Sequence, residues 1–142
     1  MITNFETSFV VMPKDCNYLG DMLFGGALLA HMDIAAAMAV RRTLYSSEVK
    51  TALTVAVNNV TFLVGATIGD LIFLKATIIK LGIKSLTILV EGHRENQYNG
   101  TIDKICTGEF VFCAVDKDRK PARHCLTMEQ VEWATERSKN SY

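Results

Sequence analysis

The sequence predicts an α+β fold in which one long helix packs against an antiparallel sheet of about five strands. Residues 27–43 are rich in alanine and leucine, which favour a helix, and this segment is apolar on nearly every side. After residue 49 the pattern changes to short runs rich in Val, Ile, Thr and Phe, with turn signals between them. Short links with no intervening helix predict an antiparallel meander.

Length and composition predict one globular domain and exclude several classes of protein. The chain has 142 residues, of which 49% are hydrophobic and 21% charged, and 15 basic residues balance 15 acidic ones. A neutral chain has no electrostatic footprint for nucleic acid, and no apolar run reaches the roughly 18 residues of a membrane-spanning helix. We expect a single domain over 1–142, with a core over about 5–121 and a tail over 122–142, in the cytoplasm and bound to neither nucleic acid nor membrane.

The four cysteines predict neither disulfides nor a metal site. No C-x-x-C pair occurs, and a chain with this much apolar surface does not need a disulfide framework. The adjacent residues His124 and Cys125 lack the paired spacing of a zinc site. We therefore expect reduced thiols and no bound metal.

The N-terminal part predicts a short strand and then a loop that leads into the helix. Residues 7–12 read as the strand, and Pro13 with the polar run 14–21 ends it. Asn17 lies in this loop, where an asparagine is more often a turn residue that hydrogen-bonds its own backbone than a functional group.

Phe24, Gly25 and Gly26 stand at the start of the predicted helix. Two glycines there let a ligand approach the backbone closely, and the free N–H groups of the first helical turn can hold a developing oxyanion. Taken alone, such a pair of glycines is more often turn chemistry.

Four further strands are predicted at 51–64, 71–81, 85–95 and 104–116. Apolar residues recur at every second position in two of these runs, which describes strands with one face on the core. These residues are Ile72, Leu74, Ala76 and Ile78 in one run, and Leu86, Ile88 and Val90 in the next. The tail from Thr127 predicts a short surface or interface helix.

One sheet can cover only one side of a helix that is apolar on nearly every side. The remaining apolar surface needs a second partner, and the simplest one is another copy of the same chain. The sequence therefore predicts a symmetric homodimer.

Asp33 is the unusual residue of the predicted helix, because its neighbours three and four positions away are all apolar. Burial of a carboxylate is costly and favours the neutral form, so Asp33 is expected to be either paired or functional. In the functional alternative, burial raises the proton affinity of the Asp33 carboxylate, so that it can act as a base near neutral pH. In the structural alternative, which carries about equal weight, it only hydrogen-bonds its surroundings and fixes the helix.

His31 precedes Asp33 by two residues, so the two side chains point roughly 200° apart around the helix. The pair is therefore not expected to form a dyad. We interpret His31 as a histidine satisfied at a helix or subunit interface. Nothing in the spacing supports a Ser/His/Asp or Cys/His site.

Several short motifs, in this order and spacing, resemble the hotdog-fold acyl-CoA thioesterases of the YciA-like and cytosolic acyl-CoA hydrolase group. The resemblance covers about residues 7 to 121. Its motifs are Asn17-Tyr18-Leu19-Gly20, Phe24-Gly25-Gly26, Met32-Asp33, Thr54-Val55-Ala56-Val57, Thr61-Phe62, Gly69-Asp70, Gly82-Ile83-Lys84-Ser85 and Phe110 to Asp116.

The resemblance implies a hotdog fold, in which a curved antiparallel sheet wraps one long central helix, and a homodimer that often assembles further into a hexamer, a trimer of dimers. It implies hydrolysis of acyl-CoA to a free acid and coenzyme A, with no bound cofactor. Asp33 would activate water or attack the thioester, Asn17 would reach the site from the opposing subunit, and the amides of Gly25 and Gly26 would polarise the carbonyl.

By the same resemblance, further residues would bind the substrate. Gly82, Lys84 and Ser85 would meet the nucleotide end of coenzyme A, and Thr54 would lie near the path of the pantetheine arm. Phe24 would also contact substrate.

The chain departs from the family pattern at identifiable places. Three residues instead of two separate Gly20 from Phe24, and this extra residue could displace Asn17 from the site. Residues 62–65 lack the basic residue and the proline common there, Asn58 replaces a usual acidic residue, and alanines follow Asp33 where glycines are frequent.

Three alternatives to an acyl-CoA thioesterase stay open, one of which is a purely structural or scaffold role. The insertion before Phe24 is compatible with a non-catalytic protein that binds or senses acyl-CoA. A hotdog dehydratase would need a histidine paired with a carboxylate across the site, and His31 faces away from Asp33, so this alternative ranks lower.

Overall fold

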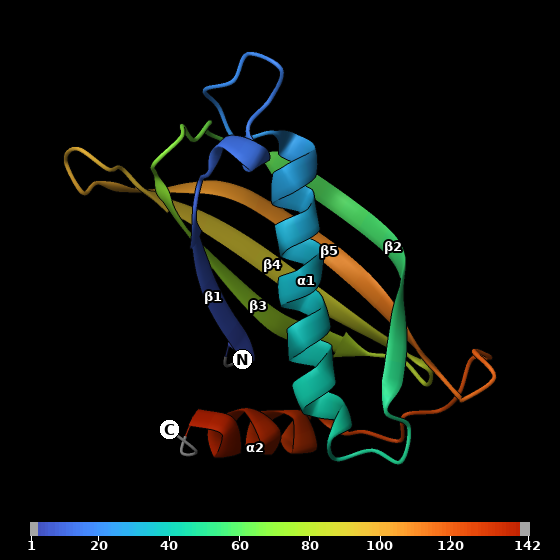
Figure 1. Cartoon of the computed structure of the whole chain (residues 1–142). Helices are drawn as coiled ribbons and strands as arrows, with labels where there is room; N and C mark the ends of the chain where they lie inside the picture. The colour runs from blue at the N-terminus through green and yellow to red at the C-terminus, as the bar shows by residue number, and fades with distance from the viewer. Residues whose placement is uncertain (1–2, 140–142) are drawn as a thin grey trace.

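The structure, a computed structural model, describes residues 3–139 as five strands, two α-helices and one short 3₁₀ turn (Figure 1). The elements in chain order are β1 (Phe5–Val10), the 3₁₀ turn η1 (Pro13–Asp15), α1 (Gly25–Leu44), β2 (Thr51–Phe62), β3 (Leu71–Leu81), β4 (Ser85–Glu95), β5 (Ile102–Val115) and α2 (Met128–Lys139). The long helix α1 lies across one face of the sheet, and α2 crosses the C-terminal end of α1. The predicted α+β class is confirmed.

The five strands form one antiparallel sheet in the order β1, β3, β4, β5, β2. Consecutive pairing of β3, β4 and β5 confirms part of the predicted meander. The expectation that β2 also continues this meander is wrong, because β2 pairs with β5, with Thr54 opposite Phe112. The second edge of β3 is taken by β1, so the link over residues 63–70 carries the chain across the end of the sheet.

Element ends differ from the predicted ones by a few residues. β1 ends before Met12 because Asp15 Oδ2 accepts a hydrogen bond from the Met12 N–H at 3.1 Å and turns the chain. α1 begins at Gly25, since the Phe24 carbonyl already accepts the N–H of Leu28 at 3.0 Å. β5 begins at Ile102, which lies opposite Glu95.

The core lies between α1 and the inner face of the sheet. All seven alternating residues predicted to face it, on β3 and β4, are buried. α1 contributes small side chains that let the sheet approach closely, together with larger apolar ones. Its apolar buried residues are Leu28, Met32, Ala35, Ala36, Ala39, Val40 and Leu44.

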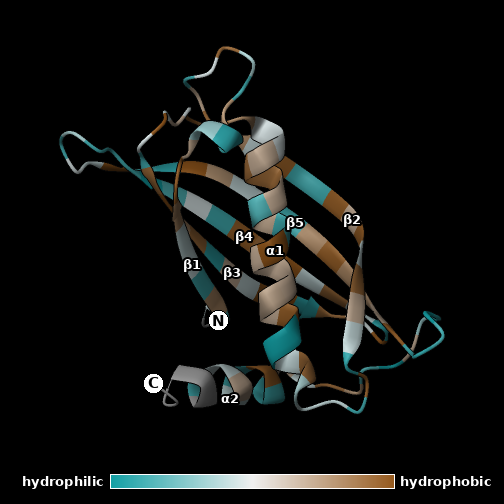
Figure 2. Cartoon of the chain, viewed as in Figure 1, coloured by the Kyte–Doolittle hydropathy of each residue, from teal (hydrophilic) through white to brown (hydrophobic). Residues whose placement is uncertain are grey.

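One side of α1 and the edge strand β2 remain uncovered in the single chain. Ile34 on α1 is 59% exposed and Val55 on β2 is 61% exposed. Figure 2 shows the hydrophobic segments of β2, which is hydrogen-bonded on one side only. Within residues 3–139 neither the sheet nor α2 covers this stripe, as expected for a single sheet that can cover only one side of the helix.

The C-terminal segment packs on the end of the fold. Val131 and Thr135 of α2 are buried, and Asn4 Nδ2 donates to Thr135 Oγ1 at 2.6 Å. Trp133 is 56% exposed, as expected of a surface or interface helix. Within residues 3–139, neither α-helix combines the length and apolarity needed to cross a membrane.

Candidate active site

Asp33 lies in the middle of α1 and is held by the edge strand β2. Its Oδ1 atom accepts a hydrogen bond from the Thr54 hydroxyl at 2.8 Å. The prediction of a buried Asp33 is wrong for the single chain, where the residue is half-buried, because it lies beside the uncovered stripe that contains Ile34. The predicted pairing is found with Thr54, a residue placed near the substrate only by the family resemblance.

The start of α1, where the resemblance predicts an oxyanion site, is formed by a pair of glycines after Phe24. Phe24 is the N-cap with an extended backbone, and the chain becomes helical at Gly25. A Cβ at Gly26 would lie 2.4 Å from the Phe24 ring, so any larger residue would require this half-exposed ring to move. The first N–H groups of α1 have no carbonyl partner within the helix, and the helix dipole makes this end attractive to negative charge.

An apolar hollow of about 250 Å³ opens beside this helix start. Leu28 of α1, Phe62 of β2 and Ile105 of β5 line it, together with residues 63–66 of the link that crosses the sheet. The Leu23 N–H donates to the Ala66 carbonyl at 2.8 Å and holds that link against the loop before α1. The hollow places apolar surface next to the free amides of the first helical turn.

Asn17 does not reach this centre in the single chain. Its Oδ1 atom accepts the Leu19 N–H at 3.1 Å, the local turn contact that an asparagine often makes. The neighbouring side chain of Tyr18 is 96% exposed at the loop tip. Within one chain Asn17 is therefore a turn residue that hydrogen-bonds its own backbone segment. Its role in the site of a second subunit stays a prediction.

Asp33 and the helix start are too far apart to meet one small group within a chain. Gly25 and Asp33 are eight positions apart on α1, which corresponds to about 12 Å at 1.5 Å per residue. A carbonyl held by the Gly25 amide is thus out of reach of the Asp33 carboxylate of the same chain. The predicted site residues therefore form two separate groups in the single chain, Asp33 with Thr54 and Phe24 with Gly25 and Gly26, which we call the two half-sites.

The turn between β3 and β4 contains the remaining predicted contacts, Gly82, Lys84 and Ser85. The Gly82 N–H donates to the Ser85 carbonyl at 2.9 Å, while Lys84 is exposed. Phe112 of β5 pairs with Leu86, next to this turn, on one side and with Thr54 on the other. The turn and the Asp33 half-site therefore lie at the same level along the sheet. Two strand spacings, about 10 Å, separate Leu86 from Thr54. A hollow of about 420 Å³ borders the turn and residues 123–126.

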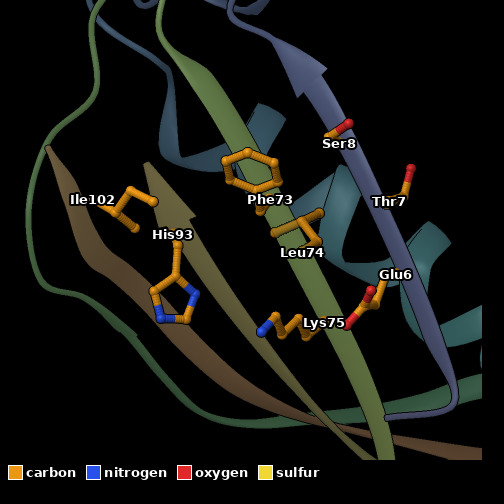
Figure 3. A pocket seen from close by; sticks show the side chains of 8 residues that line it. All are labelled: Glu6, Thr7, Ser8, Phe73, Leu74, Lys75, His93 and Ile102. Atoms are coloured by element: carbon orange, nitrogen blue, oxygen red, sulfur yellow. The ribbon is translucent and has the colours of Figure 1, made fainter. Parts of the chain in front are cut away.

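A larger hollow, of about 460 Å³, lies on the outer face of the sheet and contains none of the predicted site residues. Figure 3 shows Phe73 and Lys75 of β3 beside His93 of β4 in this hollow. These side chains alternate with the buried Ile72, Leu74 and Ala76, so they face away from α1. Both half-sites are therefore separate from this hollow.

Two buried carboxylates were not singled out as site residues from the sequence. Asp15 and Asp70 are 4% and 1% exposed, and both accept several hydrogen bonds in the loops next to the helix start. Burial acts to raise the pKa of each, but these hydrogen bonds outweigh it and keep both pKa values below normal. The sequence hints at Asp15 because it follows Pro13 in a turn, where aspartate commonly caps backbone N–H groups, and at Asp70 because it belongs to the Gly69-Asp70 motif of the resemblance.

Cys106, by contrast, has no features of a nucleophile. It is fully buried, and this burial raises the pKa of its thiol to about 11. A thiolate is the reactive form of cysteine, so Cys106 is inert near neutral pH.

Comparison with known proteins identifies the family. The model of the thioesterase superfamily matches residues 20–101, which include the helix start, Asp33, Thr54 and the turn with Lys84. The chain belongs to the thioesterase superfamily.

Relatives of this thioesterase-superfamily chain have names that specify the thioester. The chain is 35% identical over 114 residues to the uncharacterized acyl-CoA thioester hydrolase ZMO0511 of Zymomonas mobilis, covering 80% of this chain and 73% of that protein. It is 33% identical over 115 residues to the acyl-CoA thioester hydrolase YciA of Salmonella typhimurium, covering 79% and 83%. The predicted resemblance to the YciA-like group is confirmed.

Solved structures of the superfamily share the fold. The hexameric thioesterase y2039 of Yersinia pestis is 30% identical, with a TM-score of 0.76 and coverage of 85% of this chain and 94% of that one. Cj0915 of Campylobacter jejuni, a hexameric hotdog fold thioesterase, is 24% identical with a TM-score of 0.74 and coverage of 90% and 93%. The predicted hotdog fold is confirmed.

Proposed function

We propose that this protein is an acyl-CoA thioesterase, which hydrolyses acyl-CoA to a free carboxylic acid and coenzyme A. The main observation behind this proposal is the hydrogen bond from the Thr54 hydroxyl to Asp33 Oδ1 at 2.8 Å, because it holds the carboxylate in one orientation. Asp33 lies in the part of the chain that the thioesterase-superfamily model matches. The relatives named acyl-CoA thioester hydrolases support the same substrate class.

The hydrogen bond leaves the second oxygen of Asp33 free for chemistry. Thr54 occupies Oδ1, so Oδ2 can accept a proton from water as that water attacks the thioester carbonyl. The C–S bond then breaks, and the thiolate of coenzyme A takes up a proton. Alternatively, Oδ2 attacks the carbonyl itself and the C–S bond breaks to release the thiolate of coenzyme A, after which water hydrolyses the resulting mixed anhydride. Both routes place negative charge on the carbonyl oxygen, where the amides of Gly25 and Gly26 would stabilise it.

The complete site needs a second copy of the chain. The separation of about 12 Å between Gly25 and Asp33 supports a site in which one subunit supplies the helix start and the other supplies Asp33. The free edge of β2 and the exposed Ile34 offer the surface for this contact. We propose a homodimer joined along β2, with a hexamer as the further assembly, in line with the hexameric y2039.

Substrate contacts extend from both half-sites. The hollow at Phe62 would take the first part of the acyl chain, and Phe24 would flank it. Lys84 is exposed and free to contact the phosphates of coenzyme A, with Gly82 and Ser85 shaping its turn. Asn17 would approach from the opposing subunit. A location in the cytoplasm stays a prediction.

A non-catalytic acyl-CoA-binding or sensing protein is the second candidate. Its support is the position of Asn17, whose side chain is engaged with Leu19 in a loop one residue longer than the family pattern. A dehydratase has less support, because His31 contacts Asp15 instead of a carboxylate across the site.

The test is release of coenzyme A thiol from short, medium and long acyl-CoAs by wild type, Asp33→Asn and the control His93→Ala, which alters the outer face of the sheet. We expect Asp33→Asn to lower kcat at least about 100-fold and His93→Ala to behave as wild type. A folded Asp33→Asn variant with full activity would contradict the assignment. Thermal stabilisation by acyl-CoA without thiol release from wild type would favour the binding protein.

A further inference from the structure

A contact between the loop before α1 and the second turn of α1 is not used by the proposed chemistry. His31 Nε2 lies 3.4 Å from Asp15 Oδ1. The Asp15 side chain is 6% exposed and that of His31 is 28% exposed. An ionised carboxylate only accepts hydrogen bonds, so Nε2 is the protonated nitrogen that donates to it.

The His31 ring is held in this orientation from a third element. It stacks on Phe9 of β1, with ring centroids 3.8 Å apart and planes inclined by 10°. β1, the loop and α1 therefore meet at one imidazole. A ring fixed on its flat side keeps Nε2 directed at Asp15.

Asp15 also holds the loop itself at both ends. Its Oδ2 accepts the Met12 N–H at 3.1 Å, and its backbone carbonyl accepts the Phe24 N–H at 2.8 Å. These contacts close the loop of residues 16–23, which contains Asn17, and they fix the residue that caps α1. Lys14 also donates to Asp15 Oδ1 at 3.0 Å, but its side chain is largely exposed.

We propose that Asp15 and His31 are positioning residues that set the helix start, and with it the Gly25 and Gly26 amides, relative to the loop that carries Asn17. This inference rests on the proposed thioesterase function and assigns neither residue a contact with substrate. The backbone carbonyl of Asp15 holds the N-cap residue Phe24, and its carboxylate holds His31 in the second turn of α1. Asp15 therefore sets the position of the first two helical turns at both of their ends. The low pKa of Asp15 keeps its carboxylate ionised near neutral pH, as the contact requires.

The kinetic consequence is specific. Amides that stabilise the oxyanion act mainly in the transition state, so their misplacement lowers kcat and leaves KM nearly unchanged. Displacements of about 1 Å at such a site cost up to about 100-fold in rate. We expect His31→Ala to lower kcat about 10-fold with KM within about twofold of wild type.

The experiment compares His31→Ala, His31→Gln and Asp15→Asn with wild type and the control His93→Ala. Glutamine retains an N–H donor on a side chain of similar reach, so His31→Gln should recover most of the kcat lost in His31→Ala. Amide hydrogen exchange over residues 16–26 should be faster in His31→Ala and Asp15→Asn than in the other three proteins.

Each outcome decides the proposal. Wild-type kcat and exchange in His31→Ala would overturn it, and so would a His31→Gln variant as impaired as His31→Ala, because the donor would then not matter. If Asp15→Asn fails to fold, the comparison of His31→Ala with His31→Gln still gives the answer. If wild type hydrolyses no acyl-CoA, the proposed function fails, whereas the exchange comparison still tests the positioning contact.

Discussion

The hydroxyl of Thr54 donates a hydrogen bond to Asp33 Oδ1 at 2.8 Å and so joins the edge strand β2 to the middle of α1. Both residues border the side of the chain that the sheet leaves uncovered. The carboxylate is therefore oriented before any partner or substrate arrives, and one of its oxygens remains free. Preorganisation of this kind removes a reorientation step from the reaction.

Thr54→Val should lower kcat for acyl-CoA hydrolysis about 10-fold. Valine has nearly the same shape as threonine but no hydroxyl, so Asp33 loses its donor, a contact worth about 1.5 kcal/mol when the acceptor is charged. Thr54→Ser keeps the donor and serves as the matched control, with activity within about threefold of wild type. Equal loss in both variants would show that the methyl group, and not the hydrogen bond, is what matters.

Val55→Asp should separate the subunits and abolish activity together with assembly. Val55 is 61% exposed on the free edge of β2, and a charge there would be desolvated in a dimer joined along that strand. Light scattering after gel filtration measures the mass, and thiol release measures the activity. Tyr98→Asp introduces the same charge at the 88% exposed tip of the β4–β5 hairpin and should leave both unchanged. A fully active Val55→Asp monomer would contradict the two-subunit site.

Lys84→Ala should raise KM for acyl-CoA about fivefold without changing KM for an acyl-pantetheine that lacks the nucleotide. The expected loss is that of one exposed charge contact, about 1 kcal/mol. Lys75→Ala removes a lysine from the outer face of the sheet and should change neither value. If KM rises equally for both substrates in Lys84→Ala, Lys84 does not contact the phosphates.

Asp70 should make the fold acid-sensitive. Its carboxylate accepts the N–H groups of Thr67 and Gln97 at 2.9 and 3.1 Å, and these contacts outweigh burial, so its pKa is lowered on folding. A lowered pKa stabilises the fold above the ordinary aspartate range, and the stabilisation is lost as pH falls through that range toward the folded pKa. Urea unfolding at pH 7 and pH 3 should show a smaller difference for Asp70→Asn than for wild type. An identical difference would mean that Asp70 titrates alike in both states.

Within residues 3–139 the sequence predicted both α-helices and the five strands to within a few residues, because the signals for them are local. Alternation on β3 and β4 follows from the pleat of a single strand, and the apolar run of α1 from a single helix. The positions of Phe24, Gly25 and Gly26 at the helix start could be predicted for the same reason. Asp33 stood out as a carboxylate among apolar helical neighbours, which is also a local property.

Contacts between distant parts of the chain were decided by the tertiary structure alone. β1 takes the edge of β3 and β2 pairs with β5, a choice of partners that no local pattern encodes. The hydrogen bond of Thr54 to Asp33 spans 21 positions, and the contact of His31 with Asp15 spans 16. Such pairs depend on register and on the rotation of α1 against the sheet, because a local pattern determines which face a residue lies on but not which distant side chain meets it there.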